Sequence, residues 1–152
     1  MGSKIWASRY HDFSAGHRVV GHENKCRHLH GHNYRVHFKC SAEKLDGIGR
    51  VIDFGVIKEK LCMWVENNWD HKFLAWDGDT EIHTMYGAML DAPRTGQLLV
   101  DSIVWTAFNP TAENMADFLL NEIGPQMLQG TGVTLEEVVI EETRKCLAGA
   151  KL

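Results

Sequence analysis

The hydrophobic pattern of residues 33–68 changes its period, and this change strongly restricts the fold. Apolar residues alternate with polar ones between residues 33 and 42, at Tyr34, Val36, Phe38 and Cys40. A period of two is typical of a strand that buries one of its faces. From residue 54 to residue 68 the apolar spacing becomes three and four, which indicates a helix with one buried side. The chain therefore contains both a one-sided sheet and a helix that could cover it.

Three further segments have readable patterns. Residues 4–14 are rich in aromatic residues and predict a first strand, and residues 133–143 predict a last one. A second helix is expected to begin near Asn109-Pro110, because a capping residue followed by proline is typical of a helix start. Its buried face is expected to consist of Ala112, Met115, Phe118, Leu119 and Ile123. These elements predict an α+β fold with an antiparallel sheet and the helices on one face.

Residues 76–108 are harder to interpret. Leu98-Leu99-Val100 and Ile103-Val104-Trp105 suggest two strand pieces around Asp101-Ser102. We find no internal repeat, no low-complexity tract and no interdomain linker. Residues 1–152 are therefore expected to form a single domain, with a variable insertion near 76–108.

Composition narrows the functional classes. The chain of 152 residues is 44% hydrophobic and 24% charged, which is typical of a soluble globular domain. It has no apolar run long enough to span a bilayer and no apolar signal segment at its start, so a cytoplasmic location without membrane contact is expected. A net charge of −4 argues against nucleic-acid binding but leaves room for a small anionic substrate. The four cysteines include no C-x-x-C pair, which favours reduced thiols.

Histidines are concentrated near one strand end. Five of the nine histidines fall between residues 17 and 32. His30 and His32 are two residues apart on a predicted strand, so both side chains point the same way and can reach one ion. His17 follows the first strand and is the expected third ligand. Three neutral imidazoles suit zinc and leave one coordination position open for a substrate. The alternative is that these are surface or hydrogen-bonded core histidines.

Cys26 lies four residues before His30 and has two possible roles. It could be a fourth ligand, which would close the zinc site and make it structural. However, Lys25 and Arg27 flank it, and cationic neighbours lower the pKa of a thiol and make it reactive. A thiolate beside an open metal position is suited to acid–base chemistry, and we favour this second role.

Two carboxylates are further candidates. Asp70 precedes His71 directly after the first helix, and an acidic neighbour can set the tautomer and basicity of a histidine. Taken alone, this pair is a weak signal, because most such dipeptides lie in solvated loops. Glu142 continues the strand face that carries Val138 and Ile140, so its carboxylate needs a partner. A bidentate partner such as the N–H edge of a 2-amino-4-oxo pterin would suit it, whereas the alternative is a strand end at the surface.

Six ordered pieces of the chain give a more specific signal than any single one. They are Phe13-Ser14-Ala15-Gly16-His17, Cys26-x-x-x-His30-Gly31-His32-Asn33-Tyr34, Val51-Ile52-Asp53-Phe54-Gly55, Asp70-His71-x-x-Leu74, Asn109-Pro110-Thr111-Ala112-Glu113-Asn114 and Glu142-Thr143. In these pieces and their order the sequence resembles the 6-pyruvoyl-/6-carboxytetrahydropterin synthase family over nearly its whole length.

The resemblance implies a fold and an assembly. The expected fold is the tunnelling fold (T-fold), a four-stranded antiparallel sheet with two helices on one face. In this fold subunits join their sheets into an oligomeric barrel, commonly a homohexamer built as a dimer of trimers. The family's active sites are usually shared across a subunit boundary.

The resemblance also implies roles for individual residues. Zinc is expected on His17, His30 and His32. Cys26 is the expected proton acceptor, activated by Asp70 and His71, and Glu142 is the expected pterin anchor and a member of the catalytic set. Thr143 and Glu113, which belong to matching pieces, and Arg27 beside Cys26 are expected to contact the substrate.

The short C-x-x-x-H-G-H spacing resembles the 6-carboxytetrahydropterin synthase branch, which belongs to 7-deazaguanine (queuosine) biosynthesis. The implied reaction is zinc-dependent lysis of 7,8-dihydroneopterin triphosphate to 6-carboxy-5,6,7,8-tetrahydropterin, with release of acetaldehyde and triphosphate. One alternative is 6-pyruvoyltetrahydropterin synthase chemistry on the same substrate. An alternative of another class is a non-catalytic zinc- or pterin-binding protein, against which the intact Cys26, Asp70 and His71 argue. Residues 75–108 depart from the compact family members, which leaves the substrate scope open there.

Overall fold

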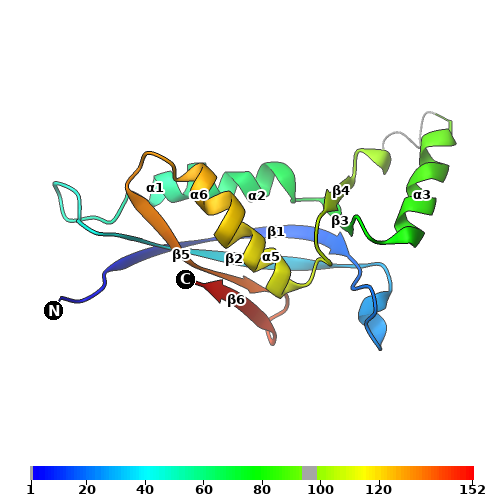
Figure 1. Ribbon diagram of the computed structural model, residues 1–152, viewed down its shortest axis with the longest axis horizontal. Helices are drawn as coiled ribbons and strands as arrows, with labels where there is room; N and C mark the ends of the chain where they lie inside the picture. Colours follow the sequence, from blue (N-terminus) through cyan, green and yellow to red (C-terminus); the bar gives the residue numbers. More distant parts are fainter. Residues whose placement is uncertain (1, 94–98) are drawn as a thin grey trace.

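The computed structural model describes residues 2–93 and 99–152, and its centre is one six-stranded sheet (Figure 1). The strands lie in the order β4-β3-β1-β2-β5-β6. Their bounds are β1 (Trp6–His17), β2 (His30–Ala42), β3 (Lys72–Trp76), β4 (Ile103–Thr106), β5 (Val133–Glu141) and β6 (Leu147–Lys151). β1, β2, β5 and β6 pair antiparallel, whereas β3 runs parallel to both β1 and β4. The α+β class is confirmed, but the expectation of four strands in an antiparallel sheet is wrong.

The parallel part of the sheet follows from the connections. β2 ends beside the start of β1, and a helical segment then leads to β3, which begins beside Ala15 and Gly16 near the end of β1 and runs parallel to it. β3 is only five residues long and directly follows Asp70-His71, so no alternating run reveals it. β6, with the sequence LAGAK, is poor in the β-branched and aromatic residues that mark strands, and it forms by pairing with β5.

Two helical segments cover one face of the sheet (Figure 1). The first consists of α1 (Phe54–Ile57), the π-helical stretch η2 (Lys58–Cys62) and α2 (Met63–Asn68). The second consists of α5 (Ala112–Phe118), a second π-helical stretch η3 (Leu119–Ile123) and α6 (Gly124–Met127). The cap of the second segment is Thr111, which accepts a hydrogen bond from the Asn114 N–H, rather than Asn109 as expected.

The segment between β3 and β4 contains a third helix. α3 (Thr80–Asp91) stands beyond the end of the sheet, beside β3 and β4 (Figure 1). The expected strand piece at 103–105 is part of β4. The expected piece at 98–100 is not a strand where it is described, because Leu99 and Val100 are helical, while Leu98 lies outside the described residues.

The core lies between the sheet and the two covering helices. Val36, Phe38 and Cys40 of β2 are fully buried there, as the alternation predicted. Met115 and Leu119 face them from the second helical segment and are also fully buried. No helix of the described residues is long and apolar enough to cross a membrane. The sheet face that carries this core continues to the end of β1 and the start of β2, where the candidate site lies.

Candidate metal centre and catalytic groups

Three histidines meet where β1 ends and β2 begins. In the antiparallel register His17 lies opposite His30, and Ala15 lies opposite His32. All three imidazoles therefore point to the core face of the sheet. Their ring centroids are 4.6–5.1 Å apart, and His17 is only 1% exposed. The structure thus brings together the three residues predicted as metal ligands.

Backbone carbonyls orient two of these rings. The Nδ1–H of His17 donates to the carbonyl of Pro110 at 2.6 Å, and the Nδ1–H of His30 donates to the carbonyl of His28 at 2.7 Å. A neutral imidazole that donates through Nδ1 carries its lone pair on Nε2, and this arrangement is typical of metal-binding histidines. These carbonyls were missed from the sequence, since neither depends on a side chain that a pattern could reveal.

The Nε2 atoms face one another at distances that suit a metal ion. His17 Nε2 and His30 Nε2 are 3.1 Å apart, whereas two nitrogen ligands of tetrahedral zinc lie roughly 3.3–3.4 Å apart. The buried Nε2 of His32 makes no well-aligned hydrogen bond with the described residues, although Glu142 Oε1 lies 2.7 Å from it. Burial lowers the pKa of His32 and outweighs the opposing attraction of Glu142, so the ring favours its neutral, ligand-competent form. The three residues present therefore fit a metal ion such as zinc.

Glu142 reaches the same cluster from the end of β5. The alternation along β5 correctly placed it on the face of Val138 and Ile140, both of which are fully buried. Its Oε1 lies 2.7 Å from His32 Nε2 and 3.4 Å from His17 Nε2. The neighbouring His17 lowers the pKa of Glu142 despite partial burial, so this carboxylate is anionic. The sequence predicted its facing but not its closeness to the histidines.

A carboxylate at this position gives the cluster four potential ligands. One ligand atom from each of His17, His30, His32 and Glu142 lies within 4.8 Å of the other three. Cys26 does not belong to this group, which counts against the closed site of three histidines and this cysteine. The carboxylate of Glu142 is placed either to bind the same metal ion or to bind an organic group next to it.

Cys26 lies in the loop that leads from β1 to β2. It is the middle residue of η1 (Lys25–Arg27), and its side chain is a free, half-buried thiol. The Cys26 carbonyl accepts a 2.7 Å hydrogen bond from the Val19 N–H. Both flanking cationic residues are exposed, and the Arg27 guanidinium donates to two carbonyls of its own loop, those of Glu23 and Asn24.

Asp70 and His71 form a pair that is fixed to β1. Asp70 Oδ2 accepts from His71 Nδ1 at 2.7 Å, and Asp70 Oδ1 accepts from the Ser14 N–H at 2.9 Å. The His71 N–H in turn donates to the Ser14 carbonyl. These bonds hold His71 at a φ of 60°, in the left-handed region that side-chain-bearing residues rarely adopt, with its ring largely exposed. Backbone strain of this kind is concentrated at functional sites.

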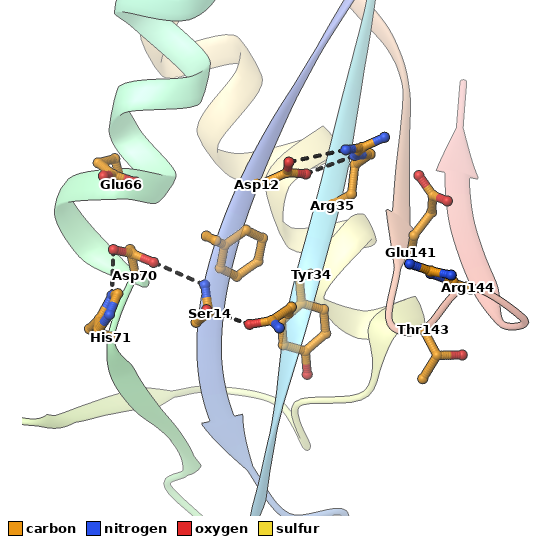
Figure 2. Close-up of a pocket in the computed structure, with 12 residues that line it drawn as sticks. Asp12, Ser14, Tyr34, Arg35, Glu66, Asp70, His71, Glu141, Thr143 and Arg144 are labelled. Carbon is orange, nitrogen blue, oxygen red and sulfur yellow. Dashed lines mark hydrogen bonds and ion pairs between the residues drawn. The ribbon is translucent and has the colours of Figure 1, made fainter.

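A hollow of about 770 Å³ lies beside this pair (Figure 2). Asp70 and His71 stand on one side of it, and Glu141, Thr143 and Arg144 on the other. A second hollow of about 500 Å³ has His32 and His71 on its walls. Cys26 lines neither hollow, so the single chain does not gather the cysteine and the Asp70–His71 pair around one space.

The two other predicted substrate contacts are placed as follows. The Thr143 hydroxyl accepts from the Lys145 and Cys146 N–H groups and so shapes the turn between β5 and β6. Glu113 is exposed in the first turn of α5. Neither contacts the histidine cluster through a bond among the described residues.

Comparison with known proteins identifies the family of this chain. Residues 7–151 match the family described as 6-pyruvoyl tetrahydropterin synthase. A 6-carboxy-5,6,7,8-tetrahydropterin synthase of Rickettsia bellii is 38% identical over 142 residues, which cover 93% of this chain and 96% of that one. A probable enzyme of the same name from Halobacterium salinarum is 34% identical over 82% of this chain and 75% of its own length.

Solved structures agree with this fold. An uncharacterized protein of Wolinella succinogenes superposes with a TM-score of 0.86 at 25% identity, covering 99% of both chains. The 6-pyruvoyl tetrahydropterin synthase of Caenorhabditis elegans superposes with a TM-score of 0.64 at 22% identity, covering 98% of this chain and 96% of its own.

Proposed function

This chain belongs to the 6-pyruvoyl tetrahydropterin synthase family and is an enzyme, and from that premise we propose that it is a 6-carboxy-5,6,7,8-tetrahydropterin synthase. The reaction would convert 7,8-dihydroneopterin triphosphate and one water molecule to 6-carboxy-5,6,7,8-tetrahydropterin, acetaldehyde and triphosphate. The observation that carries the proposal is the 37–39% identity, over 93% of the chain, to four relatives of that name.

Each group of the site has a place in this proposal. A zinc ion on His17, His30 and His32 would act as a Lewis acid toward the side-chain hydroxyls of the substrate. Cys26 would accept a carbon-bound proton, for which a free, half-buried thiol is suitable. The Asp70–His71 pair would keep that thiol in its reactive form.

The same site could serve the 6-pyruvoyl reaction, and a protein without catalysis could bind a pterin there. Incubation of the zinc-loaded protein with 7,8-dihydroneopterin triphosphate, followed by mass identification of the products, separates these three functions. Acetaldehyde together with the 6-carboxy product supports the proposal. A 6-pyruvoyl product without acetaldehyde would replace it, and unchanged substrate would favour the non-catalytic alternative.

We propose that this activity belongs to 7-deazaguanine and queuosine biosynthesis in the cytoplasm, as the resemblance of the C-x-x-x-H-G-H spacing to the 6-carboxytetrahydropterin synthase branch implies. Deletion of the gene tests this placement. Transfer RNA from the deletion strain should lack queuosine, and normal queuosine levels would refute the pathway assignment.

Glu142 is proposed to anchor the pterin through a bidentate pair with its N–H groups. Glu142→Gln should weaken substrate binding about ten- to a hundredfold, because a charge-assisted pair contributes roughly 1.5–3 kcal/mol. Glu141→Gln is the matched control, since Glu141 faces the other way and pairs with His37. The measurements are KM and zinc content for both variants.

The outcomes separate the two roles open to Glu142. An increased KM at full zinc content fits the anchor. Loss of zinc from Glu142→Gln would instead make Glu142 a fourth metal ligand, as its 2.7 Å distance from His32 Nε2 allows. Equal losses in the Glu141 and Glu142 variants would contradict the argument from strand facing.

The active enzyme is proposed to be a homohexamer, a dimer of trimers whose sites are shared between subunits. The separation of Cys26 from the hollow beside Asp70 and His71 supports a shared site. Inactive Cys26→Ala and His71→Ala chains, unfolded together and refolded, should regain part of the activity, because some sites would receive both intact groups. Each variant refolded alone is the control. No recovery from mixed oligomers would count against sharing.

A further inference from the structure

The residue after His17 connects three parts of the chain. The Arg18 guanidinium forms a fork with Asp79, from Nε to Oδ2 at 2.7 Å and from Nη2 to Oδ1 at 2.8 Å. Its Nη2 also lies 3.1 Å from Glu81 Oε1, and its Nη1 donates to the Arg27 carbonyl at 3.3 Å. Arg18 thus joins the end of β1, the start of α3 and the loop of Cys26.

Asp79 anchors this arrangement. It is only 3% exposed, and it caps α3 by accepting a hydrogen bond from the Ile82 N–H. Burial would raise the pKa of Asp79, but the hydrogen bond from Arg18 and the cap outweigh it and hold the pKa below its ordinary value. A buried carboxylate with a bidentate guanidinium partner is a rigid fixed point, because breaking the pair would leave a charge buried alone.

Arg18 and its neighbour Val19 bind the backbone of the loop that carries Cys26. The Val19 N–H holds the Cys26 carbonyl, and Arg18 holds the next carbonyl, that of Arg27. Among the described residues, the hydrogen bonds of the loop side chains stay within the loop, and His30 holds the His28 carbonyl, so Arg18 and Val19 are the residues that hold the part around Cys26.

We propose that Arg18, anchored by Asp79, is a positioning residue for Cys26. The segment between β3 and β4 then has a defined role, because through Asp79 it fixes the loop that presents the thiol. This inference rests on the proposed function only for its effect on turnover. The placement of the thiol itself can be measured without substrate.

The test compares Arg18→Ala, Arg18→Lys and Asp79→Asn with the control Glu81→Gln. Glu81 also contacts Arg18, but its side chain is 80% exposed, so losing this ion pair should have little effect on the position of Arg18. Asp79→Asn keeps an oxygen that can cap α3 while it removes the charge. Arg18→Lys keeps the charge but loses the fork and its reach to the Arg27 carbonyl.

The first measurement is the rate of iodoacetamide alkylation of Cys26, read by peptide mass spectrometry. Cys146 is exposed and serves as the internal reference, while Cys40 and Cys62 are fully buried. Releasing the loop should expose the half-buried thiol, so the ratio of Cys26 to Cys146 alkylation should rise at least about fivefold in Arg18→Ala and Asp79→Asn. Arg18→Lys should give an intermediate rise, and Glu81→Gln should stay within about twofold.

Turnover gives the second measurement. A displaced thiol should lower kcat about tenfold or more with little change in KM or zinc content, because misplacement affects the proton transfer and not binding. An unchanged alkylation ratio in folded Asp79→Asn and Arg18→Lys would overturn the proposal, even if Arg18→Ala fails to fold. Wild-type protein without lyase activity would refute the proposed function alone, because the alkylation ratio would still decide the role of Arg18.

Discussion

Replacing His32 with alanine should remove the metal and the activity together. A site of three histidine ligands that loses one of them should bind zinc at least about a hundredfold more weakly, since even lost partners of the ligands cost ten- to a hundredfold. Turnover should fall to background in the same preparation. The measurements are zinc per chain by elemental analysis, zinc affinity by competition with a chelator, and kcat.

His37→Ala is the matched control for this experiment. His37 lies on the same strand, but it points to the opposite face of the sheet and pairs with Glu141. Its loss should leave the zinc content near one per chain. Full zinc content and full turnover in His32→Ala would show that the ligand assignment is wrong.

Cys26→Ala should have the second large effect, with the opposite pattern. The variant should fold and keep its zinc, because the cluster of potential ligands does not include this residue. Its kcat should fall about 100- to 10,000-fold, which is the usual contribution of a positioned acid–base group. Cys146→Ala, which removes an exposed thiol, should behave as wild type. Loss of zinc from Cys26→Ala would instead support the alternative in which Cys26 is a fourth ligand of a closed structural zinc site.

The elements that could be predicted are those with a long periodic pattern. β2 and the two covering helical segments bury one face each, so their apolar residues repeat at two or at three and four. β3 has five residues, too few for a period to emerge, and β4, with four, is predicted only as a short apolar piece at 103–105. Their parallel pairing depends on crossovers, which are tertiary features. β6 forms because a neighbouring strand offers it a partner, and its own composition gives no signal.

The same distinction applies to the candidate site. The shared facing of His30 and His32 and the facing of Glu142 follow from strand periodicity, which is local. The contact between Glu142 and His32 requires β5 to lie beside β2, and no local pattern contains that information. The hydrogen bonds from the His17 and His30 rings to the carbonyls of Pro110 and His28 could not be predicted for the same reason.

The left-handed backbone of His71 has a consequence for any attempt to make the protein more heat-resistant. An L-residue with a φ of 60° raises the free energy of the folded state by roughly 1–2 kcal/mol compared with glycine, which adopts this region freely. Glycine at position 71 would therefore fit the backbone better, as asparagine would to a smaller degree. Directed evolution that scores only resistance to heating should accept these substitutions and lose the ring held by Asp70. A screen for turnover must accompany such a selection, because stability and activity favour different residues at this one position.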